Sequence, residues 1–289
     1  MSILLNGKLV RQRILDSLKP RADAFRTRAG RPPGLAVVLV GHDPGSEVYV
    51  RNKIKACAEL GFYSEKLTPP ETITTRELLA IVNELNNRPE IDGILVQMPL
   101  PKQVDSRLIL ESVVAEKDAD GFHPTNVGHL VANRPAPRAC TPAGVMEMLR
   151  EYNIPVDGKN AVLIGRSDIV GKPMAMMLLH ANATVTICHS RTSNLAELCR
   201  TADILVAAIG RPAFVTADFI KPGAVVIDVG MNRIPDPVKV TRLIGDVDPA
   251  AMAELSSHYT PVPGGVGPLT IAMLMSNTMS LAESHIPRD

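Results

Sequence analysis

Short apolar runs alternate with segments of helical spacing along most of this chain of 289 residues. The run at residues 35–40 is continuously apolar, which is typical of a strand buried on both faces of a parallel sheet. Further strands are predicted at residues 93–96, 161–164, 184–188, 204–209 and 225–229. The intervening segments space apolar residues three or four apart, which predicts helices over 7–29, 46–60, 106–114 and 143–152. The alternation predicts an α/β fold, with a doubly wound parallel sheet in the second half of the chain.

Several residues mark where these helices begin, bend or end. Ser46 is expected to cap the helix that runs to the glycine stop at Gly61. Thr74 and Glu77 have the spacing of a capping box, which opens a further helix. Pro20 lies inside the first helix and is expected to kink or split it, because proline has no backbone N–H to donate.

Four polar residues in the first half of the chain are candidates for chemistry. Gln97 directly follows a predicted strand, and ligands of open α/β sheets gather at the carboxyl ends of strands. Tyr49 and Lys53 lie four residues apart, so they project together from one face of their helix. Asp120 belongs to the stretch 117–122, which is too acidic and too short to be core. Each also has a structural interpretation, as a rim aromatic, a surface lysine, a strand-end polar group or a turn residue.

The stretch NAVLIGRSDIVGKP, residues 160–173, combines a strand, a glycine turn and a helix. In this context a pyrophosphate can bind the free backbone N–H groups at a helix N-terminus. The dinucleotide fingerprint has glycine at its first, third and sixth positions, which here are Gly165, Ser167 and Val170, with a glycine displaced to Gly171. Serine is small enough to admit a phosphate and can donate a hydrogen bond to it. A purely structural strand–helix turn is the alternative.

The next predicted strand is followed by Ser190 and Arg191, where NAD-binding proteins generally carry an acidic residue for the ribose 2′-hydroxyl. Arg166 lies in the preceding glycine turn. These three residues can form a cationic pocket that suits a 2′-phosphate. The sequence therefore predicts NADP rather than NAD as the cofactor, with a solvated charged loop as the alternative.

Composition narrows the class of protein. Hydrophobic residues make up 45% of the chain and the formal net charge is +1, which is typical of a globular protein large enough for two domains. This near-neutral balance and an aromatic content of 3% argue against a nucleic-acid partner, which would require a basic stripe or stacking rings. No apolar run is long enough to span a membrane and the N-terminus lacks a secretory apolar block, so a cytoplasmic location is expected.

The four cysteines and seven histidines show no metal-ligand spacing, so no metal is expected. The cysteines are interpreted as small core residues in a reducing compartment. Near the C-terminus, residues 260–268 form a glycine–proline loop, which indicates backbone shaped around a ligand, and a closing helix follows from 269 to 284. Residues 123–140 are rich in Pro, Asn and Arg and are the expected domain junction.

Six motifs follow one another along essentially the whole chain. They are YVRNK (Tyr49, Val50, Arg51, Asn52 and Lys53), DGILVQMPLP (residues 92–101), KDADGF (117–122), GRSDIVGKP (165–173), DVGMN (228–232) and PVPGGVGPLT (261–270). In this order they resemble the bifunctional methylenetetrahydrofolate dehydrogenase/methenyltetrahydrofolate cyclohydrolase family. Ala119 and Met231 stand where the family often has valine and isoleucine, and these apolar exchanges leave the catalytic positions intact.

The resemblance implies two α/β domains with a cleft between them. Residues 1–140 and the C-terminal helix 268–289 would form a folate-binding catalytic domain, and residues 141–267 a Rossmann-like domain that binds NADP. The residues implied for the cofactor are Gly165, Arg166, Ser167, Ser190, Arg191 and Met231. Those implied for the folate are Tyr49, Val50, Arg51, Asn52, Lys53, Gln97, Met98, Pro99, Asp120, Pro263, Gly264, Gly265, Val266 and Gly267. A homodimer that serves purine, methionine and histidine biosynthesis is also implied.

The resemblance further implies two consecutive reactions, the NADP-dependent oxidation of 5,10-methylenetetrahydrofolate and the hydrolysis of the resulting 5,10-methenyl compound to 10-formyltetrahydrofolate. Hydride transfer depends mainly on positioning, whereas the hydrolysis requires a proton-transfer group. Lys53 would be that group, with Gln97 orienting it. Tyr49 would stack on the pterin ring, and Asp120 would accept hydrogen bonds from its amino-pyrimidine edge. A dehydrogenase-only relative and a non-catalytic NADP-binding regulator are the alternatives.

Overall fold

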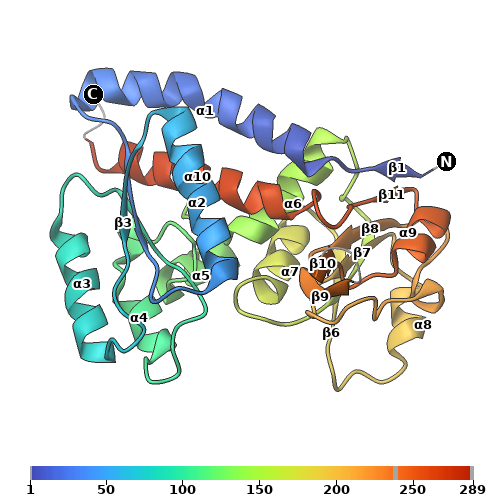
Figure 1. Ribbon diagram of the computed structural model, residues 1–289. Helices are drawn as coiled ribbons and strands as arrows, with labels where there is room; N and C mark the ends of the chain where they lie inside the picture. The colour runs from blue at the N-terminus through green and yellow to red at the C-terminus, as the bar shows by residue number, and fades with distance from the viewer. Residues whose placement is uncertain (1, 237–239, 287–289) are drawn as a thin grey trace. The chain divides into compact units, whose positions relative to one another are not determined.

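The computed structural model describes residues 2–236 and 240–286, so residues 287–289 of the expected closing-helix range lie outside the described part. The chain divides into two compact units (Figure 1). Unit 1 comprises Met1–Arg11 and Thr141–Thr270, and unit 2 comprises Gln12–Cys140 and Ile271–Asp289. By their contacts the first eleven residues group with residues 141–270. The domain assignment that the resemblance implies stays a prediction.

Unit 1 contains a six-stranded sheet in which every pairing is parallel. In spatial order its strands are β1 (Ile3–Leu4), β11 (His258–Tyr259), β8 (Val225–Asp228), β7 (Ile204–Ala207), β5 (Asn160–Ile164) and β6 (Thr184–Cys188). Its helices are α6 (Cys140–Glu151), α7 (Gly171–His180), α8 (Leu195–Cys199) and α9 (Pro249–Leu255). The antiparallel strands β9 (Asn232–Asp236) and β10 (Val240–Ile244) complete the unit. The predicted parallel sheet is confirmed.

Unit 2 has a three-stranded parallel sheet with β2 (Gly34–Val38) between β3 (Tyr63–Leu67) and β4 (Gly93–Val96). All five residues of β2 are buried, because alternate side chains pack into different clusters. One face packs against α1 (Gly7–Ala29), α2 (Pro44–Leu60) and α10 (Gly267–Ser284), and the other against α3 (Thr75–Asn87) and α4 (Ser106–Ser112). A 3₁₀ turn at Ala115–Lys117 and helix α5 (Pro124–Val131) follow α4.

The helix signals are partly confirmed. Thr74 and Glu77 form the predicted capping box, and Gly61 ends α2 with a φ of 66°. The expected cap at Ser46 is wrong, because Asp43 caps α2 and its carboxylate accepts a hydrogen bond from the Ser46 N–H at 2.7 Å. Pro20 does not split α1, which is continuous from Gly7 to Ala29.

The residues expected to form a domain junction, 123–140, include the helix α5 and all belong to unit 2. The division between the units falls directly after them, at Cys140 and Thr141. Among the described residues, no helix is both long enough and apolar enough to cross a bilayer.

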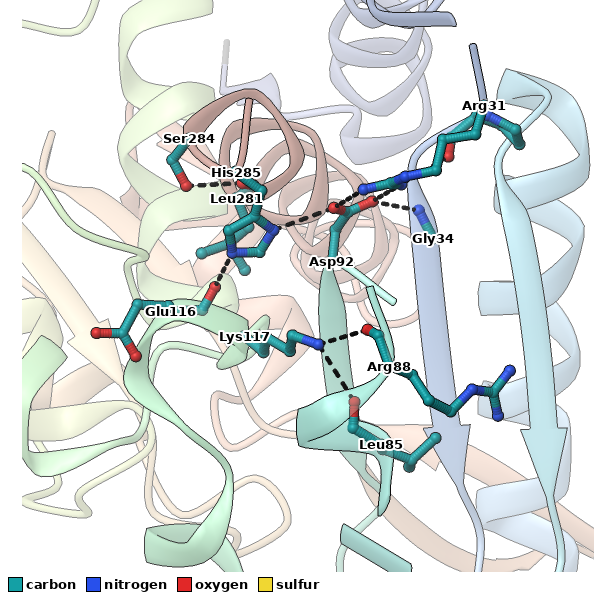
Figure 2. Close-up of polar contacts among 11 residues, drawn as sticks. Arg31, Gly34, Leu85, Arg88, Asp92, Glu116, Lys117, Leu281, Ser284 and His285 are labelled. Atoms are coloured by element: carbon teal, nitrogen blue, oxygen red, sulfur yellow. Dashed lines mark hydrogen bonds and ion pairs between the residues drawn. The ribbon is translucent and has the colours of Figure 1, made fainter. Parts of the chain in front are cut away.

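A buried carboxylate, Asp92, fixes the start of β4 in unit 2. Figure 2 shows it between Arg31 and His285. Arg31 donates two hydrogen bonds to the carboxylate, at 2.7 and 2.8 Å, and the Gly34 N–H donates a third at 2.8 Å. The ring Nδ1 of His285 lies 3.1 Å from the same carboxylate. Burial alone would raise the pKa of Asp92, but the hydrogen bonds from Arg31, His285 and Gly34 hold that pKa below its ordinary value.

We expect Asp92→Asn to lower the free energy of unfolding by about 3 kcal/mol, because the change removes the charge that a partly buried guanidinium faces. A depressed carboxyl pKa stabilises the fold above the ordinary carboxyl range and loses that contribution as the pH falls through the folded-state pKa. The difference between the two proteins should therefore shrink below about pH 4. Urea unfolding at several pH values measures it.

Glu90→Gln is a matched control, since Glu90 pairs with Arg88 while its side chain is 45% exposed. An exposed ion pair contributes about 0–1 kcal/mol. Equal losses for the two variants would contradict the role given to Asp92.

Candidate active site and cofactor site

Lys53 and Gln97 are brought together by two elements of unit 2. Lys53 lies on the buried face of α2 and is only 7% exposed, so it is not a surface lysine. Its Nζ donates a hydrogen bond of 2.9 Å to Oε1 of Gln97, which directly follows β4. The Gln97 amide is held in turn, because its Nε2 donates to the Met98 carbonyl at 2.7 Å. The pair is therefore a fixed amine–amide contact at the carboxyl end of a parallel strand.

Asp120 lies close enough to Lys53 for their charges to interact. Burial raises the pKa of Asp120 to about 6, the nearby Lys53 charge opposes this, and Asp118 adds to it. Within residues 2–236 and 240–286, no hydrogen-bond donor is assigned to the Asp120 carboxylate, which therefore keeps its acceptor capacity for a ligand. The expectation that residues 117–122 are too polar for the core is wrong at Ala119, which is fully buried, and at Asp118, which is 6% exposed.

The other predicted residues of the first two motifs have different environments. Tyr49 is half-buried on α2, one turn before Lys53. Val50 is buried in the core of unit 2, so its side chain packs against protein, whereas Arg51 and Asn52 are exposed. Met98 is partly buried and joined through a cis peptide to the exposed Pro99. The structure thus groups Lys53, Gln97 and Asp120, while the ligand contacts expected of the remaining residues stay predictions.

The glycine turn of unit 1 is closely packed against neighbouring backbone. Gly165 has a φ of 132°, and a Cβ there would lie 2.3 Å from the carbonyl oxygen of Ala208. A Cβ on Gly171 would lie 2.6 Å from the Cα of Arg166. Both positions therefore require glycine, as the displaced fingerprint predicts. The Ser167 hydroxyl accepts hydrogen bonds from the backbone N–H groups of Val170 and Gly171, at 3.2 and 3.3 Å, and keeps its own proton for a ligand.

The predicted 2′-phosphate residues follow adjacent strands of one parallel sheet. Ile164 of β5 pairs with Cys188 of β6, so the residues after both strands leave the same edge of the sheet. Arg166, Ser190 and Arg191 lie in these two segments and are all exposed. The segment after β6 is a turn, in which the Arg191 N–H donates to Nδ1 of His189 at 3.1 Å. The backbone of this turn is thus fixed, while the Arg191 side chain is exposed.

Residues 263–267 form the expected turn in unit 1. Pro263 follows a cis peptide and is exposed, Gly264 has a φ of 107°, and Gly265 and Val266 are buried. A Cβ on Gly267 would lie 3.0 Å from Cε of Met231, so this predicted folate residue and this predicted cofactor residue are neighbours. The ligand contacts of both stay predictions.

Two buried acids organise the loops at the same end of the unit 1 sheet, and the sequence did not identify them as part of a site. Asp228 accepts hydrogen bonds from the N–H groups of Gly230, Asp246 and Val247. Burial raises its pKa to about 6, against the effect of these donors. Asp246 accepts from the N–H groups of residues 209–211 and from the Asn232 amide. The sequence signal nearest to these acids is the DVGMN motif, which contains Asp228. Among the described residues, no group of three or more His, Cys, Asp or Glu could hold a metal ion.

Two family models match the chain. The model described as tetrahydrofolate dehydrogenase/cyclohydrolase, catalytic domain, matches residues 5–120, and that described as the NAD(P)-binding domain matches residues 139–286. The bifunctional protein FolD of Solibacter usitatus (strain Ellin6076) is 62% identical over 301 residues, with 98% of each chain covered. That of Koribacter versatilis (strain Ellin345) is 54% identical over 301 residues, covering 98% of this chain and 97% of the relative.

Solved structures give the same result. The crystal structure of the bifunctional enzyme FolD from Campylobacter jejuni has a TM-score of 0.94 at 45% identity, covering 99% of this chain and 100% of that one. The FolD structure from Trypanosoma brucei, complexed with NADP cofactor and inhibitor, has a TM-score of 0.94 at 38% identity, covering 98% of each chain. With its six motifs, its two parallel sheets and these matches along nearly its whole length, the chain belongs to the tetrahydrofolate dehydrogenase/cyclohydrolase family.

Proposed function

We infer that this chain catalyses two consecutive reactions of folate one-carbon metabolism. It oxidises 5,10-methylenetetrahydrofolate with NADP and hydrolyses the resulting 5,10-methenyltetrahydrofolate to 10-formyltetrahydrofolate. The observation that carries this function is the buried Lys53, which contacts Gln97 and faces the charge of Asp120 within the part of the chain that matches the catalytic-domain family model. An enzyme that carried out only the dehydrogenase reaction would not need a buried lysine amine held in one orientation.

The glycine turn of unit 1 fits NADP. Gly165 and Gly171 leave no room for a Cβ, so the turn backbone and the N-terminus of α7 can approach a pyrophosphate. We propose that Ser167 contacts this group and that Arg166, Ser190 and Arg191 bind the 2′-phosphate. Met231 would contact the remainder of the cofactor. When bound, NADP accepts the hydride of the first reaction.

Lys53 is proposed to move the protons of the hydrolysis. Water adds to the methenyl carbon and loses a proton, which gives a neutral carbinolamine. The hydroxyl of this intermediate then loses its proton as one of the two carbon–nitrogen bonds breaks, and the released nitrogen gains a proton, so that one proton is set free overall. An amine beside the reacting carbon can exchange protons with the attacking water. Gln97 accepts a hydrogen bond from Lys53 without adding a charge, and its own bond to Met98 fixes the direction of the acceptor. Gln97 therefore orients the amine in a defined direction.

Substrate binding is proposed to use Asp120, Tyr49 and the loop 263–267. The Asp120 carboxylate suits the donor-rich amino-pyrimidine edge of the pterin, because such charge-assisted hydrogen bonds are strong. Tyr49 would stack on the pterin ring. Arg51 and Asn52 are exposed next to Lys53 on α2, and with Met98 and Pro99 they would contribute to the rim. Residues 263–267 would line the folate with their backbone.

We further propose that the protein is a cytoplasmic homodimer and that its product serves purine, methionine and histidine biosynthesis. These proposals rest on the family, and sedimentation of the purified protein tests the first of them. A dehydrogenase-only relative or a non-catalytic NADP-binding regulator would not need the Lys53–Gln97 contact. The bifunctional enzyme is therefore the function that the site supports best.

We expect Lys53→Met to reduce the hydrolysis of added 5,10-methenyltetrahydrofolate by about 10²–10⁴-fold, because a general acid–base group contributes about that much. Dehydrogenase activity should fall less, since methionine keeps the volume of the side-chain stem. Absorbance assays of the two half-reactions measure both rates.

Lys55→Met is the matched control, because Lys55 is an exposed lysine two residues along the same helix. It should leave both rates near those of the unchanged protein. A Lys53→Met variant that binds folate normally and hydrolyses at the parent rate would exclude Lys53 as the proton-transfer group.

We expect Arg191→Ala to reduce the preference for NADP over NAD, measured as the ratio of kcat/KM values, by about 10-fold to 150-fold. The range corresponds to one charge-assisted contact of about 1.5–3 kcal/mol. Arg166→Ala should act in the same direction. Arg150→Ala removes an exposed arginine of α6 that pairs with Glu147, and the ratio should not change. An unchanged ratio in both turn variants would argue against a 2′-phosphate pocket here.

We expect Asp120→Ala to weaken tetrahydrofolate binding by about 10-fold to 100-fold while NADP binding is unaffected, because the pterin donors lose their acceptor. A raised pKa near 6 means that the carboxylate is ionised only above that pH. Affinity for tetrahydrofolate should therefore rise between about pH 5 and pH 7, and this rise should be smaller in the variant. Calorimetric titrations measure both. Equal weakening for both ligands would indicate a folding defect instead.

A further inference from the structure

The backbone around Asp120 is anchored by side chains on both sides of that residue. Lys117 donates hydrogen bonds to the carbonyls of Leu85 and Arg88, at 3.3 and 2.6 Å, near the end of α3 (Figure 2). The Asp118 carboxylate accepts from the N–H groups of Gly121 and His123, at 3.0 and 2.8 Å. Asn126 Nδ2 donates to the same carboxylate at 2.9 Å. These contacts close the turn that presents Asp120.

Asn277 of α10 holds the residue just before Asp120. Its Nδ2 donates to the carbonyl oxygen of Ala119 at 2.9 Å and to that of Arg138 at 2.8 Å. The Asn277 side chain is buried, at 7% exposure, and the Ala119 side of the contact is buried as well. Both amide protons thus bind backbone carbonyls, and one of these carbonyls belongs to the peptide that joins Ala119 to Asp120.

At Gly121, the turn after Asp120 lies very close to the backbone of Arg138 and Ala139. Gly121 has a φ of 76°, and a Cβ there would lie 2.5 Å from the carbonyl carbon of Arg138 and 2.7 Å from the Ala139 nitrogen. The turn after Asp120 therefore packs directly on the backbone segment whose carbonyl Asn277 also binds. The turn has no room to shift toward the backbone at Arg138. The hydrogen bond from the Asn277 amide to the Ala119 carbonyl prevents the turn from moving away.

We propose that Asn277 is a positioning residue for the Asp120 carboxylate, because its amide ties the peptide before Asp120 to the closing helix. The proposal rests on the role in folate binding proposed above for Asp120. It predicts that Asn277 acts on folate affinity through Asp120 and has no effect on NADP affinity. Loss of the amide removes the Asn277 donor from the half-buried Arg138 carbonyl and leaves the Ala119 carbonyl with the weak Cys140 thiol donor at 3.5 Å, so the turn relaxes to satisfy both.

Asn277→Leu, which has a similar shape and no donors, should weaken tetrahydrofolate binding by about 10-fold. Thr278→Val is the control, since Thr278 is the fully buried neighbour on α10 and its hydroxyl donates a hydrogen bond to the Leu274 carbonyl of its own helix. It should lower thermal stability without changing folate affinity. Asn277→Ser keeps one donor and should give an intermediate affinity, so the series stays informative if the leucine variant does not fold.

A double-mutant cycle with Asp120→Ala gives the deciding result. If Asn277 acts through Asp120, Asn277→Leu should have no further effect on tetrahydrofolate binding in the Asp120→Ala protein. An equal loss in both backgrounds, or unchanged folate affinity in both Asn277 variants, would overturn the positioning role and leave that of Asp120 intact. Normal folate affinity in Asp120→Ala alone would overturn the role proposed for Asp120, and the inference about Asn277 with it.

Discussion

The charge of Asp92 has to be balanced inside the core of unit 2, and that requirement fixes several chain segments at once. Its partners come from the segment before β2, from the first residue of β2 and from the residue after α10. Because β2 and β4 are adjacent parallel strands, holding their starting ends sets their register. The register continues to the other end, where the Gln97 N–H donates to the Val38 carbonyl and the Gln97 side chain reaches Lys53.

The acidic side chains of the core and of the candidate active site fall into two kinds. Asp92, Asp118, Asp228 and Asp246 accept several hydrogen bonds each, and they shape strands and turns. The donors of Asp92 are mainly side chains, whereas those of the other three are mainly backbone N–H groups. Asp120 differs, because among the described residues no donor is assigned to its carboxylate, while burial raises its pKa to about 6. An acid that is desolvated and without donors destabilises the protein unless a ligand uses it. The contrast separates the residues that shape the fold from the one proposed to bind folate.

The sequence predicted the buried strands well, and also the glycine turn that packs tightly against neighbouring backbone. Continuous apolar runs identified the buried parallel strands, and the requirement for glycine at Gly165 and Gly171 follows from backbone packing that the fingerprint reflects. It failed where local signals compete or are too short. Asp43, Pro44 and Ser46 all suit a helix start, and only the structure shows that Asp43 is the cap. Strands β1 and β11 have two residues each, too few for a pattern, so the sequence did not predict them. The Asn277 amide joins residues 158 positions apart, which no local pattern can indicate.

One chain carries out both reactions in sequence, and the protein catalyses the hydrolysis as well as the oxidation. The most direct test follows NADPH and 5,10-methenyltetrahydrofolate together by absorbance, after the purified protein is mixed with 5,10-methylenetetrahydrofolate and NADP. We expect NADPH to rise while the methenyl compound stays at a low steady level and 10-formyltetrahydrofolate forms in an amount equal to that of NADPH. Accumulation of the methenyl compound in step with NADPH, with decay only at the rate of the buffer, would contradict this expectation.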